Sequence, residues 1–147
     1  MENRVDKNNN LNLNLKALIA LSRAEQKVHQ KEYVTIKECG LTVSQFGVLE
    51  VLNHKGDLKI CDIIEKVLGT SGNITVVIKN LEKDGLIKKY PDPEDKRAVL
   101  ISITEKGKNI IDNMFPKHLE NINNIFSVLT DEEKQDLIKI AKKLTNR

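Results

Sequence analysis

Residues 70–104 read TSGNITVVIKNLEKDGLIKKYPDPEDKRAVLISIT, and this stretch decides the fold. Its apolar residues first recur at the helical spacing i, i+3, i+4, i+7, from Ile74 to Leu81. Gly85 then ends the predicted helix, and two short strands follow, at about 86–90 and 98–103, around a charged loop. The order helix, glycine, strand, loop, strand is that of the second half of a winged helix-turn-helix. We therefore predict a mainly α-helical chain with a small β-hairpin wing.

The same stretch gives details of the hairpin. Pro91 and Pro93 are expected to interrupt the first strand, because proline cannot donate to a strand ladder. In the second strand the alternating residues are expected to point inward; these are Val99, Ile101 and Ile103. Residues 92–97 form the loop, which places Asp95 and Arg97 at its tip.

Helical patterns flank this module on both sides. A first helix is predicted from Leu11 to about Glu38, before Gly40, and Thr42 with Gln45 forms a capping box for the second. A third helix, at about 60–68, is expected to pack Ile60, Ile63, Ile64 and Val67. After the hairpin a helix begins at Thr104, with Pro116 expected to kink it or sit at a break. Thr130 and Glu133 form a capping box for the last helix.

These elements suggest four segments: a frayed terminus at 1–10, a dimerisation helix at 11–40, the winged helix-turn-helix at 41–104, and dimerisation helices at 105–147. The apolar stripe of the long first helix needs a partner, either within one subunit or in a second subunit. We favour a homodimer, because a chain of this size has little else to cover that stripe. The expected dimerisation residues are Leu15, Leu18, Ile19, Leu137, Ile138 and Leu144.

Composition narrows the class of protein. The 147 residues are 39% hydrophobic but only 3% aromatic, so the core must be aliphatic, as suits packed helices. The net charge of +3 permits nucleic-acid binding without deciding it, because residues 70–106 carry seven basic and six acidic side chains. A membrane span is not expected, because no apolar run reaches about 18 residues. The polar N-terminus does not resemble a signal peptide, and we expect a cytoplasmic protein.

Neither a metal nor a cofactor is expected. Cys39 and Cys61 are the only cysteines and form no CxxC pattern, while the three histidines lack metal-site spacing. Both thiols are expected to be buried and inert, with a thiol-based redox-sensing regulator kept as an alternative. No nucleophile–base pair or phosphate-binding loop is present in the sequence, so an enzyme is not expected.

The predicted helix at 74–83 has the residues of a DNA-reading element. Short polar side chains at its start would let the backbone lie deep in a major groove, and free N–H groups there attract phosphate. The candidate DNA-binding residues on this helix are Ser71, Gly72, Asn73, Thr75, Val76, Lys79 and Asn80. The alternative is that Ser71, Gly72 and Asn73 only cap a helix, but the winged context favours the functional interpretation.

The loop supplies three further candidates for DNA binding, which are Asp95, Lys96 and Arg97. Arg97 is one of only four arginines in a lysine-rich chain, which suggests a role for its planar guanidinium group. Arginine is well suited to a narrow A·T minor groove, where the potential is most negative. Asp95 is positioned to hold Arg97 or Lys96 by an ion pair. The alternative is a solvated charged turn.

Several motifs together make the chain resemble the MarR family of bacterial regulators. They are Gly40–Phe46 (GLTVSQF), Ser71–Thr75 (SGNIT), Leu81–Ile87 (LEKDGLI), Asp92–Arg97 (DPEDKR) and Thr104–Gly107 (TEKG). The similarity extends from about residue 11 to the end of the chain, and the wing motif is its most diagnostic part.

This resemblance implies a homodimer formed by the first and last two helices. It also implies binding to a palindromic operator in double-stranded DNA, action as a repressor, and release by a small-molecule effector or by thiol oxidation. Val76 departs from the family pattern, in which a polar or basic residue is frequent, and Val76 could instead touch a thymine methyl group. The main rival function is a winged-helix protein-interaction adaptor that does not bind DNA.

Overall fold

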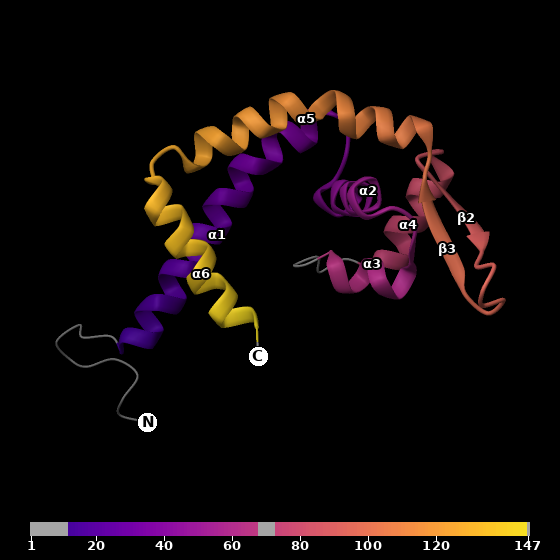
Figure 1. Ribbon diagram of the computed structural model, residues 1–147. Coiled ribbons are helices and arrows are strands. Elements are labelled where there is room, and N and C mark those ends of the chain that lie inside the picture. Colours follow the sequence, from indigo (N-terminus) through magenta and orange to yellow (C-terminus); the bar gives the residue numbers. More distant parts are fainter. Residues whose placement is uncertain (1–11, 68–72, 147) are drawn as a thin grey trace. The chain divides into compact units, whose positions relative to one another are not determined.

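The computed structural model describes residues 12–67 and 73–146, which form six helices and one three-stranded sheet (Figure 1). This confirms a mainly α-helical fold with a small hairpin wing. Contacts divide the chain into two units. We call Val34–Asn124 the winged unit, and the residues up to Tyr33 and from Ile125 onward the terminal unit. The segment boundaries predicted from the sequence remain a prediction, and the frayed segment 1–10 lies outside the described residues.

The winged unit is built on three short helices: α2 (Val43–Lys55), α3 (Ile60–Lys66) and α4 (Ile74–Lys83). The capping box at the start of α2 is present, because Thr42 Oγ1 accepts the Gln45 N–H at 3.1 Å and Gln45 Oε1 accepts the Thr42 N–H at 3.1 Å. The core is aliphatic, as the composition predicted. Its fully enclosed side chains, each with 0% exposure, are Val48, Leu49, Ile63, Ile78, Leu81 and Ile101.

The end of α4 is fixed by a Schellman motif. The Leu86 N–H donates to Leu81 O at 2.9 Å, and the Gly85 N–H donates to Glu82 O at 3.0 Å. This arrangement needs a left-handed residue after the helix, and Gly85 adopts φ 74°. The chain can therefore turn at once from α4 into the wing, which sets the geometry between the two.

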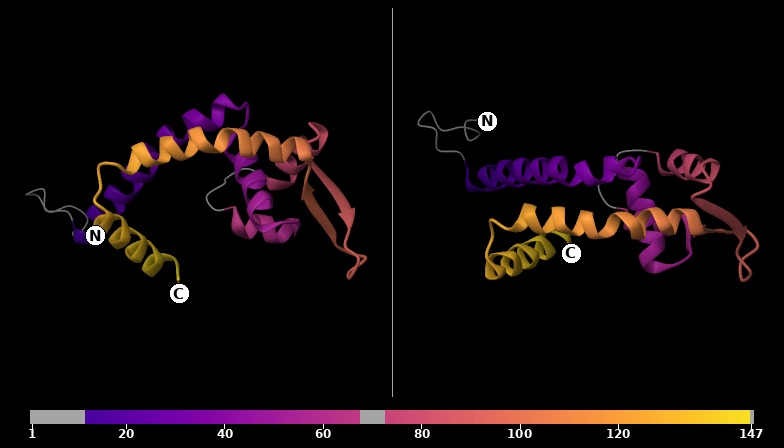
Figure 2. Two further views of the ribbon diagram at one scale, coloured as in Figure 1. Left: turned by 45° about the horizontal axis from the view of Figure 1, so that its top comes forward. Right: turned by 90° about the horizontal axis from the view of Figure 1, so that it is seen from above.

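The sheet contains β1 (Leu58–Lys59), β2 (Ile87–Pro91) and β3 (Val99–Ile103), in the antiparallel order β1-β3-β2. The left view of Figure 2 shows the two arrows of the hairpin, β2 and β3, side by side. Pro91 belongs to β2 and pairs with Val99, so the expectation that it interrupts the strand is wrong. The Asp92 N–H donates to Ala98 O at 3.1 Å, so the preceding pair is not hydrogen-bonded. Position 91 therefore faces the open edge of β2, where a missing N–H costs nothing.

Two other expectations about packing are corrected. Val99 is 42% exposed because it pairs with Pro91 beside the wing loop, at the end of the sheet away from the buried Ile101. Ile64 is 52% exposed, since α3 turns Ile63 and Val67, four residues apart, toward the core and leaves Ile64 on its flank.

Helix α5 (Glu105–Phe126) begins against the wing. Thr104 caps it by accepting the Gly107 N–H at 3.1 Å, and its hydroxyl donates to Gly85 O at 2.7 Å. A Cβ at Gly107 would lie 2.4 Å from Leu86 O, so only glycine permits this close approach. Pro116 lies inside α5, which continues on both sides of it, so of the two outcomes expected there, a kink or a break, the break is not found. Proline removes one backbone hydrogen bond while the flanking turns keep theirs.

The terminal unit contains most of α1 (Leu13–Glu38) and all of α6 (Asp131–Thr145). Helix α1 ends where the sequence predicted, before Gly40 with φ 81°. The predicted capping box of α6 is also present, with Thr130 Oγ1 accepting the Glu133 N–H at 3.1 Å and Glu133 Oε1 accepting the Thr130 N–H at 3.0 Å. The hydrogen bond from the Thr130 backbone lowers the pKa of Glu133, which keeps the cap charged.

Candidate nucleic-acid interface

Helix α4 separates its apolar and polar residues onto two faces. Ile74, Ile78 and Leu81 are buried, with Val77 half-buried beside them, as the helical spacing predicted. The opposite face is exposed, and it carries Asn73, Thr75, Val76, Lys79, Asn80 and Lys83. The winged unit therefore presents a helix face of hydrogen-bonding and basic groups whose other side is anchored in the core.

The start of α4 is capped by Asn73, whose Oδ1 accepts the Thr75 N–H at 3.0 Å. Asn73 therefore has a capping role in this structure, which was the alternative considered for it. Ser71 and Gly72, the other two candidates at this end, lie outside the described residues. Among the exposed residues of α4, Val76 stands apart because it is apolar and 49% exposed.

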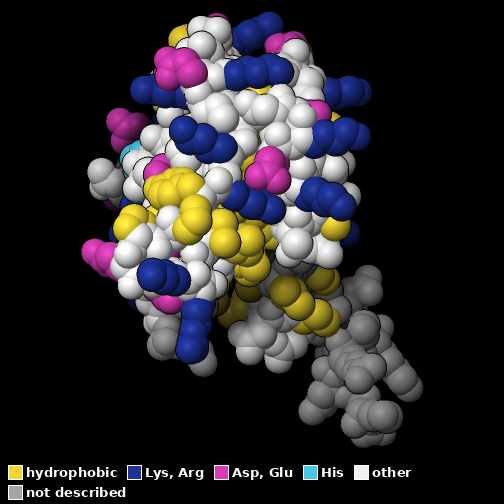
Figure 3. Space-filling model, turned by 90° about the vertical axis from the view of Figure 1, so that its right-hand side faces the viewer, with side chains coloured by type: hydrophobic (Ala, Val, Ile, Leu, Met, Phe, Trp, Pro, Cys, Tyr) yellow, Lys and Arg dark blue, Asp and Glu magenta, His cyan; other side chains and the backbone are white. Residues whose placement is uncertain are grey.

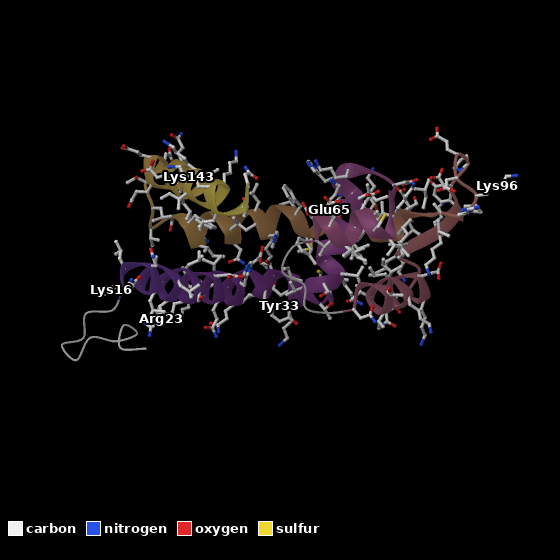
Figure 4. All side chains as sticks on the ribbon, turned by 90° about the horizontal axis from the view of Figure 1, so that it is seen from below. Lys16, Arg23, Tyr33, Glu65, Lys96 and Lys143 are labelled. Atoms are coloured by element: carbon white, nitrogen blue, oxygen red, sulfur yellow. The ribbon has the colours of Figure 1, made fainter. Side chains whose placement is uncertain are left out.

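The wing tip is shaped by two aspartate side chains that accept backbone N–H groups. Asp92 Oδ1 accepts from Glu94 at 2.9 Å, and Asp95 Oδ1 accepts from Arg97 at 3.1 Å. Within the described residues Asp95 forms no ion pair with Lys96 or Arg97, so the predicted ion pair is wrong. The short aspartate side chain instead folds onto its own turn. Both cations stay exposed, and Lys96 extends from the wing tip away from the strands (Figure 4).

Three side-chain contacts tie the wing to the rest of the winged unit. The Tyr90 hydroxyl donates to Asp57, Lys59 Nζ lies 3.8 Å from Asp92 Oδ2, and Lys89 Nζ lies 3.8 Å from Glu82 Oε1. The hydrogen bond to Asp57 is the main cause that raises the pKa of Tyr90. Sequence reasoning missed these contacts. Asp57 and Lys59 are two residues apart in one segment, and Tyr90 and Asp92 are two residues apart in the other. Only the strand order shows that these two segments lie close enough for contact.

A groove of about 420 Å³ lies within the winged unit, between the end of α1 and the middle of α5. Its apolar lining is Cys39, Ile110 and Met114, and its polar lining is Thr35, Glu38, Asn113 and Lys117. Lys117 Nζ donates to Glu38 Oε2 at 2.9 Å, and this contact raises the pKa of Lys117. The groove thus combines apolar walls with an ion pair at its edge.

Beside this groove is a buried polar contact. Thr35 Oγ1 and His118 Nδ1 are 2.7 Å apart, and the His118 ring lies 5.0 Å from that of Phe46. His118 is only 4% exposed, so it links α1, α2 and α5 from inside the unit. This histidine therefore belongs to the packing of the unit.

The two cysteines differ from each other. Cys39 is half-buried and donates to Ile36 O at 2.9 Å, and burial is the main cause that raises its pKa. Cys61 is exposed, so the expectation that both thiols are buried is wrong for it. It lies at the second position of the short helix α3, two residues after the end of the strand β1, and its side chain is exposed there.

The residues predicted for dimerisation lie on the surface of the terminal unit. Leu15 and Ile19 are half-buried, and Leu18 is exposed. On α6 no residue is buried, and Leu137, Ile138 and Leu144 are 44%, 55% and 65% exposed. These helices therefore carry an apolar surface that their own unit does not cover.

In residues 12–67 and 73–146, no group of three or more His, Cys, Asp or Glu side chains is arranged to hold a metal ion. Among the helices that the structure describes, none combines the length and apolar character needed to cross a bilayer.

Comparisons with known proteins agree with this geometry. The family model "Transcriptional regulator SarA/Rot" matches residues 31–114. The HTH-type transcriptional regulator MhqR of Bacillus subtilis, a MarR-family protein, is 37% identical over 130 residues, covering 88% of this chain and 90% of MhqR. The chain belongs to the MarR family. The proteins of this family are DNA-binding transcriptional regulators and not enzymes, and the same holds for this chain.

Solved MarR-type structures share the fold. Bordetella bronchiseptica BpsR, whose DNA binding is regulated by 6-hydroxynicotinic acid, is 26% identical with a TM-score of 0.78, covering 87% of this chain and 91% of BpsR. A MarR family regulator from Streptomyces coelicolor, solved in complex with DNA, is 18% identical with a TM-score of 0.80, covering 89% of this chain and 84% of that one. At 18% identity, the similarity to the Streptomyces coelicolor protein shows only that the two chains share a fold.

Proposed function

We propose that this MarR-family protein acts as a homodimer on a palindromic operator, with one winged unit reading each half-site. The observation that carries the proposal is the exposed face of α4, where Thr75, Lys79 and Asn80 stand on a helix anchored by its opposite side. Such a helix fits a major groove, and half-sites would then lie about 34–36 Å apart. The Streptomyces coelicolor structure, which was solved in complex with DNA, supports DNA binding by the shared fold.

In the same proposal, the wing contacts the minor groove beside each half-site. Arg97 and Lys96 are exposed at the wing tip, and Asp95 holds the turn without neutralising either cation by an ion pair. A guanidinium group suits a narrow A·T minor groove. Figure 3 shows Lys and Arg side chains spread over this face of the winged unit, which favours contact with phosphates as well.

We further propose that the protein is a repressor in the cytoplasm and that a small ligand releases it from DNA. The groove between α1 and α5 supports a ligand site, because its apolar walls and the Lys117–Glu38 pair suit a small molecule with one polar end. BpsR, which responds to a small aromatic acid, supports regulation of this kind in the fold. A ligand that favours one spacing of the two reading helices would change the affinity for DNA.

Two alternatives have specific observations behind them. An adaptor function would use exposed apolar side chains, and Val43, Ile64 and Val76 are 47%, 52% and 49% exposed on three different helices. A thiol-based regulator would use Cys61, the exposed cysteine. We rank both below a ligand-released regulator, because the exposed face of α4 is mainly polar and basic, and the side-chain contact of the Cys61 sulfur is to the Asp62 carboxylate at 4.0 Å and not to a basic group.

The test is a fluorescence-anisotropy titration against duplexes from the DNA upstream of the protein's own gene, at two salt concentrations. Selective binding that weakens as salt rises is expected, since phosphate contacts release counterions. Arg97→Ala should weaken selective binding by more than about tenfold. Arg23→Ala is the matched control, because it removes an exposed arginine from α1 in the terminal unit.

The outcomes separate the alternatives. Binding that is weak and unselective for these duplexes, and for those recovered by selection from a random pool, would contradict an operator-binding function and favour the adaptor. An Arg97→Ala variant as tight as the wild type would remove the wing from the proposal while leaving α4 in place.

A further inference from the structure

Strand β2 is held to the winged unit from both of its faces. The register places Tyr90, Leu100 and Lys59 in one row across the sheet, and Lys89, Ile101 and Leu58 in the next row, on the opposite face. Lys89 reaches Glu82 of α4 on the face of the buried Ile101, while Tyr90 reaches Asp57 on the other face. The wing is thus tied to α4 through one face of the sheet, and to the segment between α2 and β1 through the other face.

Two side-chain contacts cross β3 on the face of the sheet that carries Tyr90 and Lys59, which we call the outer face. Tyr90 of β2 reaches Asp57, which stands just before β1, and Asp92 just after β2 reaches Lys59 of β1. Asp92 also accepts the Glu94 N–H, and its own N–H donates to Ala98 O, so it joins β1 directly to the wing loop. These contacts connect the loop that carries Arg97 to a segment about 35 residues earlier in the chain.

The two contacts are unequal in strength. Solvent reaches both contacts, but Lys59 Nζ and Asp92 Oδ2 are 3.8 Å apart, which is too far for a well-formed hydrogen bond, and the Lys59 side chain is 40% exposed, so solvent screens this pair. A phenol donating to a carboxylate makes a charge-assisted hydrogen bond, which is about twice as strong as a neutral one. The phenol carries its proton at neutral pH, and the hydrogen bond to Asp57 raises its pKa further. Tyr90 and Asp57 therefore form the main tether.

A tether matters because a two-stranded ribbon has little stability of its own. Among the described residues, no strand lies beside the outer edge of β2, and β1 supplies only two residues of pairing, both to β3. Backbone pairing alone therefore leaves the hairpin free to move relative to α4. Side-chain contacts at its base limit that motion.

We propose that Tyr90 and Asp57 are positioning residues for DNA binding. Their hydrogen bond sets the wing relative to α4, so that Arg97 meets the DNA when α4 lies in the major groove. The inference rests on the proposed wing contact and adds to it the pair of residues that holds the wing ready before DNA arrives. A wing fixed in this way loses less conformational freedom on binding.

Tyr90→Phe tests this, because it removes one hydroxyl and leaves the ring. Selective binding in the anisotropy titration should weaken about threefold to tenfold, the effect of about one net hydrogen bond. Asp57→Ala should give the same loss, and Asp57→Asn, which keeps an acceptor, should give a smaller one. Tyr33→Phe is the matched control, since it removes the chain's other tyrosine hydroxyl from α1.

A double-mutant cycle with Arg97→Ala separates positioning from a general loss of stability. If Tyr90 acts through the wing tip, Tyr90→Phe should cost less than about twofold when Arg97 is already absent. An equal loss in both backgrounds, or no loss from Tyr90→Phe in the wild type, would overturn the inference. If Arg97→Ala itself binds as tightly as the wild type, the wing contact and this inference both fail, while operator binding through α4 stands.

An independent measurement follows the hydroxyl itself. In the Tyr33→Phe background the absorbance of phenolate reports Tyr90 alone, and its pKa should lie above the ordinary value of 10.0. Asp57→Ala should move that pKa back toward the ordinary value. A Tyr90 pKa that does not respond to Asp57→Ala would show that the hydrogen bond is absent in solution and would overturn the inference whatever the binding data.

Discussion

Val76 is an apolar side chain on α4, surrounded by hydrogen-bonding and basic residues and 49% exposed. An exposed valine gains nothing from water but can contact the 5-methyl group of thymine in a major groove. Its exposure is therefore understandable if that surface is covered when DNA binds.

This role of Val76 gives a prediction that changes only the DNA. Replacing one thymine of each half-site by deoxyuridine, which lacks the methyl group, should weaken the wild type about threefold at the position that Val76 faces. Val76→Ala should be insensitive to the same replacement, measured by anisotropy. Val43→Ala, which shortens another exposed valine on α2, should keep the wild-type sensitivity. A deoxyuridine scan without effect at any position would contradict methyl recognition.

The cysteines give a second prediction at the scale of the residue. The thiolate is the reactive form, and burial raises the pKa of Cys39, so its thiolate fraction at pH 7 to 8 is lowered. Cys61 is exposed. A thiol-specific reagent such as a disulfide chromophore should therefore modify Cys61 first in the native protein. Cys61→Ser should remove the fast phase and Cys39→Ser the slow one; the reverse assignment would show that the groove around Cys39 opens readily.

At the scale of the element, the junction between α4, the wing and α5 depends on Gly107. The Thr104 hydroxyl donates a hydrogen bond to Gly85 O. The backbone of Gly107 approaches Leu86 so closely that a Cβ at Gly107 would lie 2.4 Å from the carbonyl oxygen of Leu86. This junction holds the first turn of α5 on the segment that joins the recognition helix to the wing.

Gly107→Ala should therefore destabilise the protein by about 1–3 kcal/mol, although alanine is ordinarily the better helix former. The free energy of unfolding in urea measures this, and DNA affinity should fall with it because α4 and the wing meet here. Lys108→Ala, on the exposed side of the same turn, is the control and should stay within about 0.5 kcal/mol of the wild type. A stabilised Gly107→Ala protein would mean that α5 can shift away without loss.

The sequence predicts an element well when the interactions that form it lie within a few residues of each other. Helix ends were predicted well because their signals lie within a few residues, as with Thr42 and Gln45 or the glycine after α4. Pro91 was misjudged because its effect depends on which edge of β2 is open, which the residue itself does not reveal. The tether between Tyr90 and Asp57 was missed for the same reason, since it follows from strand order across a separation of 33 residues.

The candidate DNA-binding surface shows a similar division. The exposed face of α4 follows from helical periodicity, so the sequence alone predicted it. The role of Asp95 did not, because an aspartate two residues before an arginine can accept either its side chain or its backbone N–H. The turn geometry decides between them, and here the backbone N–H is the partner.

At the scale of the whole molecule, the open question about architecture is what covers the terminal unit. Large apolar side chains there are exposed and are not covered by the described residues of their own unit, and monomeric proteins seldom expose large apolar patches. They are Leu13, Leu18, Leu21, Val128, Leu137, Ile138, Ile140 and Leu144. A palindromic operator requires two reading helices, so the same surface that needs covering can supply the symmetry that the function needs.

Placing charges in this surface tests that link. Leu137→Glu combined with Ile138→Glu should abolish the dimer at micromolar concentration in sedimentation equilibrium, because two carboxylates would be desolvated in an interface that otherwise buries about 800 Å² per partner. Gln135→Glu places one carboxylate elsewhere on the exposed surface of α6 and should leave the dimer intact. Circular dichroism on the same samples shows whether the separated chains keep their helices, and either result is a loss of the dimer.

The variant should also bind a full operator no more tightly than a single half-site, because the second winged unit is no longer held beside the first. An intact dimer would place the interface elsewhere and would leave the exposed leucines and isoleucines of α6 for another partner.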